Sequence, residues 1–178
     1  MPSIRCTAIL FLLASLPSYA DESGGKFAVS IEIPRLNVSE YHRPYVAVWI
    51  QDENKQAVAN LAVWYQMKRS SEGGGTKWLP DLRQWWRRSG RSLDMPVDGV
   101  SGATRPAGKH SIELALDEKR LTNLSPGKYS VMIEASREVG GRELLELPFD
   151  WPATTGQSAQ STGKEELGVA ALRIQPSK

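Results

Sequence analysis

Apolar and polar residues alternate along most of the chain with a period of two, which is the pattern of half-buried β-strands. The first clear case lies near the N-terminus, where Phe27, Val29, Ile31 and Ile33 alternate with small or polar residues. Gly, Pro, Asn and Asp turns separate this segment from others of strand-like composition. About seven short strands predict an all-β fold, a single immunoglobulin-like antiparallel β-sandwich. The further strand-like segments are 45–51, 61–66, 110–116, 129–135, 144–149 and 168–174.

Two segments lack this alternation. Residues 67–109 form a long connection with little periodicity, and connections of that length inside a compact domain usually have a function. Within it, Pro80 is followed by Leu82, Trp85 and Trp86, which predicts a helix of one or two turns whose apolar side packs on the sandwich. Residues 153–163 are polar and of low complexity, so we predict a flexible loop before the last strand.

The N-terminus has the features of a cleaved secretory signal peptide. Arg5 supplies the positive charge, and residues 8–16 are an apolar run too short to cross a bilayer. Small residues then stand where signal peptidase needs them, so we predict cleavage after Ala20. The mature chain, residues 21–178, is expected to be one exported, periplasmic domain.

Composition and charge exclude several classes of function. Cys6 is the only cysteine and lies in the signal peptide, so the mature chain has no disulfide, thiolate metal site or cysteine nucleophile. The chain has 22 Lys and Arg against 20 Asp and Glu, and loss of Arg5 leaves 21 basic residues. This balance gives no long-range field for a nucleic-acid partner, and no later apolar stretch is long enough for a transmembrane anchor. His42 and His110 lie far apart in sequence, so no metal site is predicted.

The most informative stretch reads Asp-Gly-Val-Ser-Gly-Ala-Thr and ends at Thr104. It resembles the acceptor motif of proteins that are flavinylated by exported FAD:protein FMN transferases. In that motif the last threonine receives FMN through a phosphoester bond. Asp98 matches the acidic position of the motif, and Thr104 stands at the acceptor position. The resemblance implies covalent FMN on Thr104 and a partner transferase. The other matching residues are Ser101, Gly102 and Ala103.

The residue types suit this chemistry independently of the resemblance. A transferase must bring the acceptor hydroxyl to reaction distance of a diphosphate, so the acceptor needs an exposed, narrow loop. Gly102 permits backbone angles that are closed to other residues, and Ala103 offers little bulk to the enzyme. Asp98 is a candidate either to bind the metal ion of the transferase or to activate the hydroxyl. The alternative interpretation is an ordinary turn that leads into the strand at His110.

Six segments carry a wider resemblance: 43–50, 78–82, 85–86, 98–108, 127–129 and 134–138. They make the chain similar, from about residue 27 to residue 141, to a family of periplasmic proteins classed as domain of unknown function 2271. Members of that family often carry the flavinylation motif, which implies a partner transferase and a membrane-bound reductase. The chain departs from the family after Leu114, where residues 115–118 replace a Trp-Asp-Gly turn.

Three tryptophans, Trp78, Trp85 and Trp86, share the long connection with Thr104. Indole rings stack readily on an isoalloxazine ring, which makes all three candidate flavin contacts. The alternative, which we favour, is a small core packed under the connection. Four arginines in the same region have two interpretations. They bind a flavin phosphate or an acidic partner, or they form a solvated face. They are Arg83, Arg87, Arg88 and Arg91.

Two hypotheses of function follow. In the first, the sandwich holds a flavin on Thr104, accepts electrons from a membrane reductase and passes them on. No acid–base pair is evident in the sequence, so we expect a redox carrier rather than an enzyme in its own right. In the second, the chain is a cofactor-free immunoglobulin-like module that binds a peptide, a glycan or a protein partner, since this fold hosts many recognition functions.

Overall fold

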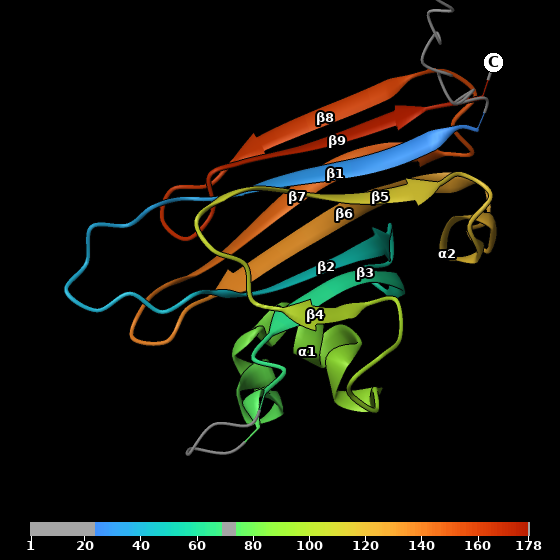
Figure 1. The fold of residues 1–178 in the computed structure, drawn as a ribbon. Helices are drawn as coiled ribbons and strands as arrows, with labels where there is room; N and C mark the ends of the chain where they lie inside the picture. The colour runs from blue at the N-terminus through green and yellow to red at the C-terminus, as the bar shows by residue number, and fades with distance from the viewer. Residues whose placement is uncertain (1–23, 69–73, 178) are drawn as a thin grey trace, which may run out of the picture.

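The computed structural model describes residues 24–68 and 74–177 and contains two β-sheets packed face to face (Figure 1). The signal-peptide prediction for residues 1–20 lies outside the described residues. The first sheet has the order β5–β1–β9–β8, with β1 Lys26–Ile33, β5 Gly108–Ala115, β8 Gln157–Thr162 and β9 Val169–Gln175. The second has the order β4–β3–β2–β6–β7, with β2 Tyr45–Asp52, β3 Ala57–Tyr65, β4 Ser101–Ala103, β6 Gly127–Ser136 and β7 Arg142–Trp151.

The pairing of the strands is that of an immunoglobulin-like sandwich, as the alternation predicts. The hairpins β2–β3 and β6–β7 are joined by β2–β6 pairing, which is the C′–C–F–G order, and β1 pairs with β5 as strand B pairs with E. Strand β9 takes the place of strand A beside β1. The hydroxyl of Tyr129, near the start of β6, donates a hydrogen bond of 2.8 Å to the carbonyl of Ser125, which is the tyrosine corner typical of strand F.

Burial follows the alternation in most strands but not in β2, β3 and β6, which lie next to one another in the five-stranded sheet. In β1 the odd-numbered side chains of Phe27, Val29 and Ile31 are fully buried between the sheets. In β2, by contrast, residues 46–51 are buried on both faces. The reason is a second apolar cluster on the outer face of the five-stranded sheet, where a helical segment covers the β2 side chains of Ala47 and Trp49.

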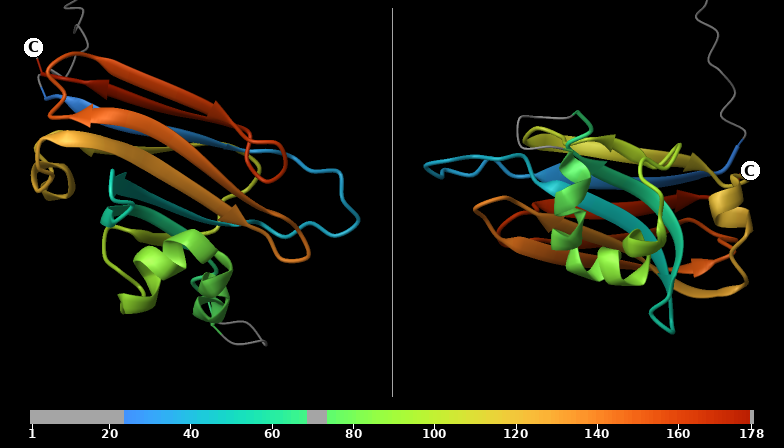
Figure 2. Two further views of the ribbon diagram at one scale, coloured as in Figure 1. Left: turned by 180° about the vertical axis from the view of Figure 1, so that it is seen from behind. Right: turned by 90° about the horizontal axis from the view of Figure 1, so that it is seen from below.

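This helical segment comprises η1 Gly75–Asp81, α1 Arg83–Arg88 and η2 Gly90–Ser92, and it packs across the outer face of the five-stranded sheet (Figure 2). The predicted helix is thus confirmed. The Trp85 side chain is fully buried and its indole N–H donates a 2.8 Å hydrogen bond to Asn60 of β3. The buried carboxylate of Glu134 in β6 accepts the backbone N–H groups of Gln84 and Trp85 at 3.0 and 2.8 Å. Glu134 therefore ties the first turn of α1 to the sheet.

The prediction of a flexible loop over residues 153–163 was wrong. Most of this segment is β8, which pairs antiparallel with β9 at the edge of the four-stranded sheet. The side-chain amide of Gln157 also exchanges two hydrogen bonds, of 2.9 and 2.8 Å, with the backbone of Asp150 in the other sheet. An edge strand can be polar on both faces, so its composition resembles that of a loop. The described residues form nine strands rather than about seven.

Candidate functional site

The centre of the motif that ends at Thr104 is a short strand and not an exposed loop, contrary to expectation. Strand β4 pairs parallel with β3, opposite Val63 and Tyr65. The Val63 N–H donates to the Val100 carbonyl at 2.9 Å, and the Thr104 N–H donates to the Tyr65 carbonyl at 3.2 Å. These two hydrogen bonds flank β4, one before its first residue and one after its last. Thr104 therefore has a defined position at the edge of the five-stranded sheet.

A tight turn precedes β4. The Ser101 hydroxyl accepts the Val97 N–H at 2.8 Å, and the Asp98 carboxylate accepts the Gly99 N–H at 3.0 Å. Gly99 has φ +66°, which is the left-handed region that favours glycine. The expected special backbone angle at Gly102 was wrong, because Gly102 lies within β4. A Cβ atom at Gly102 would lie 3.3 Å from the Trp64 ring, so close packing explains this glycine instead.

Asp98 and Thr104 lie at opposite ends of β4. A three-residue strand spans roughly 10 Å at about 3.3 Å per residue, which is too long for a hydrogen bond between the two side chains. Asp98 is exposed, and Thr104 is partly exposed. The geometry therefore disfavours activation of the Thr104 hydroxyl by Asp98 within the folded chain. The other role considered for Asp98, binding the metal ion of a transferase, stays a prediction.

A cavity of about 650 Å³ opens at one end of the sandwich, and Thr104 lines it. Its other walls come from the β1–β2 loop, the end of β3, the helical segment and the β6–β7 turn. The β1–β2 loop and the β6–β7 turn correspond to the B–C and F–G loops, which lie side by side at the left of Figure 1. Three aromatic side chains contribute to the lining: Tyr41, Tyr45 and Trp78. The volume lies within the range of small-molecule binding sites.

Two of the four arginines on the cavity wall are engaged in ion pairs. Arg137 donates from Nε and Nη2 to the Glu166 carboxylate at 2.8 and 3.0 Å, and both side chains are buried. Arg142 Nη1 lies 3.0 Å from Oε1 of Glu134. These pairs neutralise charge on the wall and hold the β6–β7 hairpin against its neighbours.

The other two arginines on the wall, Arg43 and Arg83, make no ion pair within the described residues. The carboxylates of Asp81 and Glu138 line the same cavity, so its charges largely cancel. Burial raises the pKa of the Tyr45 hydroxyl above its usual value, and the Glu138 and Asp81 carboxylates add to this rise against a hydrogen bond with the Gln66 backbone. Tyr45 is therefore a neutral hydrogen-bonding group at neutral pH.

The structure separates the three candidate tryptophans. Trp78 lines the cavity with Thr104, and its side chain is 42% exposed. Trp85 is buried in the second apolar cluster and Trp86 is partly buried against it, so both pack as the small-core alternative predicts. Among the four candidate arginines only Arg83 reaches the cavity. Arg87 and Arg88 instead donate to backbone carbonyls, those of Arg83 and Lys55 respectively.

No sequence pattern pointed to Arg120, which supports the motif from outside it. Arg120 lies in α2 Lys119–Thr122, just after residues 115–118. Its Nη1 atom donates to the carbonyls of Gly99 and Leu61, both at 3.2 Å. Arg120 thus links the turn before β4 to strand β3. Arg120 and Gly99 are 21 residues apart in the sequence, so a local sequence pattern does not predict their contact.

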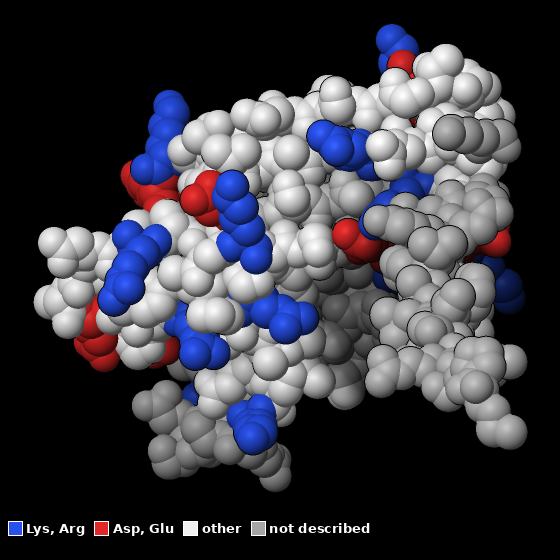
Figure 3. All heavy atoms as spheres, turned by 45° about the horizontal axis from the view of Figure 1, so that its top comes forward, with Lys and Arg blue, Asp and Glu red and all other residues white. Residues whose placement is uncertain are grey.

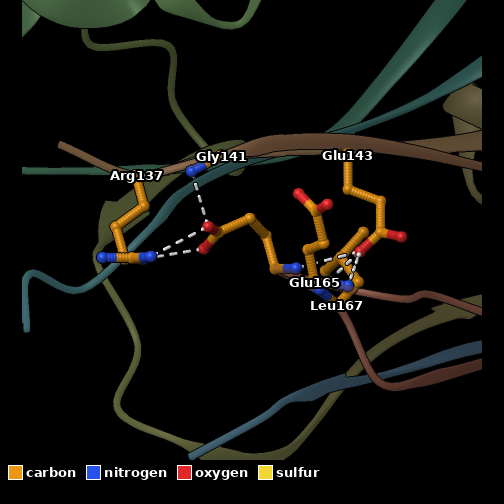
Figure 4. Close-up of polar contacts among 6 residues, drawn as sticks. Arg137, Gly141, Glu143, Glu165 and Leu167 are labelled. Atoms are coloured by element: carbon orange, nitrogen blue, oxygen red, sulfur yellow. Dashed lines mark hydrogen bonds and ion pairs between the residues drawn. The ribbon is translucent and has the colours of Figure 1, made fainter. Parts of the chain in front are cut away.

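The β6–β7 turn, which forms one wall of the cavity, is fastened to residues 164–167 by two carboxylates (Figure 4). Glu166 accepts the Gly141 N–H at 2.7 Å in addition to its two bonds from Arg137. Glu143 accepts backbone N–H groups from residues 164–167, including those of Glu166 and Leu167 at 3.0 and 2.9 Å. The segment before β9 therefore positions a wall of the cavity.

Glu143 is expected to make the stability of the fold depend on pH in the acid range. Burial by itself raises the pKa of Glu143, but the N–H donors of residues 164–167 outweigh burial and the net pKa is lowered. Its folded-state pKa lies below the unfolded value of about 4.3, so its stabilisation is present above that value and is lost as pH falls through the folded-state pKa. Urea denaturation between about pH 7 and about pH 3 should show a steeper loss of stability for wild type than for Glu143→Gln. Identical pH profiles would contradict this.

Val139 at the tip of the β6–β7 turn is expected to be a site of strain. It has φ +52° and is 77% exposed, and a left-handed conformation costs a non-glycine residue about 1–2 kcal/mol. Asparagine tolerates this conformation, so Val139→Asn should raise the free energy of unfolding by about 1 kcal/mol in urea denaturation. Val58→Asn is the control, because Val58 is also exposed but lies in β3, where no stabilisation is expected. Equal effects of the two substitutions would exclude the strain.

Comparison with known families decides the identity of the chain. The family model DUF2271, described as a predicted periplasmic protein, matches residues 26–169. The chain belongs to the DUF2271 family. The DUF2271 match runs from the first residue of β1 to the first residue of β9, so it includes the motif and every wall of the cavity. No curated protein and no solved structure matched the chain.

The DUF2271 description places the protein in the periplasm. No helix within residues 24–68 and 74–177 is long and apolar enough to span a membrane. The same residues contain no group of three or more His, Cys, Asp or Glu side chains that could hold a metal ion. On the face in Figure 3, basic side chains stand singly or in small groups between uncharged atoms, with acidic groups among them.

Proposed function

We propose that this DUF2271 protein is a periplasmic electron carrier with FMN attached covalently to Thr104. The observation that carries the proposal is the position of Thr104. The residue at the acceptor position of the motif also lines a cavity of small-molecule size, together with the aromatic side chains of Tyr41, Tyr45 and Trp78. A chance match of a short Ser-Gly-Ala-Thr string would not require a cavity beside its threonine.

Attachment requires an FAD:protein FMN transferase as partner. The Thr104 Oγ atom attacks the phosphorus on the FMN side of the FAD diphosphate. The new bond joins Oγ to phosphorus, the bond between the two phosphates breaks, AMP leaves, and the hydroxyl proton passes to a base or to solvent. Thr104 is partly exposed, and its neighbours Ala103 and Arg105 are exposed, which suits approach of an enzyme to this hydroxyl.

The residues around Thr104 suit the role of a carrier. When bound, the flavin supplies the redox chemistry by taking up two electrons with a proton and giving them back. The chain supplies the attachment point and a cavity whose wall combines aromatic, hydroxyl and guanidinium groups. We therefore propose electron exchange with a membrane-bound reductase and a second redox protein, and no reaction on a separate substrate.

The test is the intact mass of protein exported to the periplasm together with an active transferase. The expected result is the addition of one FMN, mapped to the peptide that contains Thr104, and no addition when the transferase is catalytically inactive. An unmodified mass, in cells where the same transferase modifies another acceptor protein, would overturn the proposal. The cofactor-free binding module would then be the better reading, with the same cavity as its binding site.

A further inference from the structure

We propose that the isoalloxazine ring of FMN on Thr104 does not extend into solvent but docks in the adjacent cavity, against the indole of Trp78. This inference rests on the proposed function and specifies the position of the isoalloxazine ring. It concerns the residues that line the cavity beside Thr104: Tyr41, Tyr45, Trp78, Arg83 and the β6–β7 turn.

The cavity wall has both apolar and polar groups, as the isoalloxazine ring does. An isoalloxazine ring has an apolar benzenoid end and a polar end with carbonyl and N–H groups. The cavity offers aromatic faces from Tyr41 and Trp78 for stacking. It also offers donors at the Tyr45 hydroxyl and at the guanidinium groups of Arg43 and Arg83, which make no ion pair within the described residues. A site with this mixture of groups is typical of small-molecule pockets.

Trp78 is held in place without being buried. Its neighbour Leu79 is buried in the second apolar cluster, which anchors η1 on the sheet. At the start of η1, a Cβ atom on Gly75 would collide with the Gln66 carbonyl and the Tyr45 hydroxyl, so η1 lies directly on the end of β3. The Trp78 indole is therefore a partly exposed aromatic surface on a rigid support, at the wall of the cavity that Thr104 shares. The Lys77 ammonium lies 4.8 Å from the centroid of its ring, so the flavin ring would stack on the face that Lys77 leaves open.

The covalent tether makes docking favourable even when the cavity has low intrinsic affinity. A short flexible linker gives its attached group an effective concentration on the order of millimolar near the attachment point. Thr104 is itself a lining residue, so the ring begins at the cavity. A cavity with a dissociation constant of about 0.1 mM or less for the free ring would hold the tethered ring for roughly nine-tenths of the time.

The test compares flavin fluorescence in FMN-loaded wild type, Trp78→Ala and Trp78→Phe, each at a verified FMN mass. Wild type is expected to be dim and shielded from iodide quenching. Trp78→Ala should be several-fold brighter and more accessible to iodide, and Trp78→Phe should be intermediate. Trp86→Phe is the control, because Trp86 lies in the same helical segment but outside the cavity lining. A loaded wild type as bright and as accessible as free FMN would overturn docking and leave the attachment standing.

A second experiment tests the cavity in protein that carries no covalent FMN. Unmodified wild type is titrated with free riboflavin to millimolar concentration. Saturable quenching of riboflavin fluorescence that is lost in Trp78→Ala supports a flavin-ring site in this cavity, whether or not Thr104 is modified. The absence of any binding in wild type, together with an unmodified mass, would overturn both proposals. Circular dichroism of each variant confirms that the sandwich is folded.

Discussion

Replacing Thr104 with alanine is expected to abolish covalent flavin and to leave the fold unchanged. The hydroxyl is the only group in the proposal that can form the phosphoester bond, so the FMN mass and the yellow colour should be lost completely. The backbone bond from the Thr104 N–H to the Tyr65 carbonyl is kept in the variant. Because the side chain is partly exposed, the free energy of unfolding should change by no more than about 0.5 kcal/mol.

Two control variants test whether the Thr104 hydroxyl itself is the attachment point. Thr104→Ser keeps a hydroxyl at the same position and should retain FMN, at least in part. Ser101→Ala removes the other hydroxyl of the motif, which in the structure accepts the Val97 N–H at 2.8 Å. It should cost about 1 kcal/mol of stability and keep FMN on Thr104. FMN that persists on Thr104→Ala would place the attachment at another residue and refute the assignment.

Replacing Glu166 with leucine is expected to destabilise the fold by about 3–5 kcal/mol, measured by urea denaturation. The Glu166 side chain is only 3% exposed and is the ion-pair partner of Arg137, whose side chain is 6% exposed. Removing the carboxylate would leave a buried positive charge without a partner and would also orphan the Gly141 N–H. The β6–β7 turn at the cavity wall should loosen as a consequence.

The double variant Arg137→Met with Glu166→Leu should recover much of the lost stability, because both buried charges are then absent. Only the Gly141 N–H would still lack its acceptor. Glu165→Ala is the matched control, since Glu165 is exposed and contributes its backbone N–H, which the variant keeps, to Glu143. A cost below about 1 kcal/mol for Glu166→Leu would show that water or a rearrangement compensates Arg137.

The position of the cavity relates the fold to the proposed function. Immunoglobulin-like sandwiches gather their connecting loops at the two ends of the domain, and in variable domains the B–C and F–G loops of one end bind ligands. In this protein the corresponding β1–β2 loop and β6–β7 turn form walls of the cavity, and the end of β4 brings Thr104 to the same place. A rigid scaffold thus places an attachment site beside a pocket.

The sequence by itself determined the features that depend on local order along the chain. Alternation of apolar side chains, as in Phe27 to Ile33, predicted the sandwich because each strand buries one face. Pro80 and the apolar residues after it predicted the short helix for the same reason, since the spacing of side chains fixes which face packs. The motif ending at Thr104 was also visible, because a modifying enzyme must recognise a contiguous segment.

Tertiary structure alone decided the features that depend on partners distant in sequence. Residues 157–162 are a strand only because β9 offers a free edge, and β4 exists only because β3 lies beside it. The cavity joins segments up to about a hundred residues apart, so no local pattern could show that Trp78 lines the same cavity as Thr104 while Trp85 is buried. Backbone pairing and the packing of two sheets set these positions, and both are properties of the whole fold.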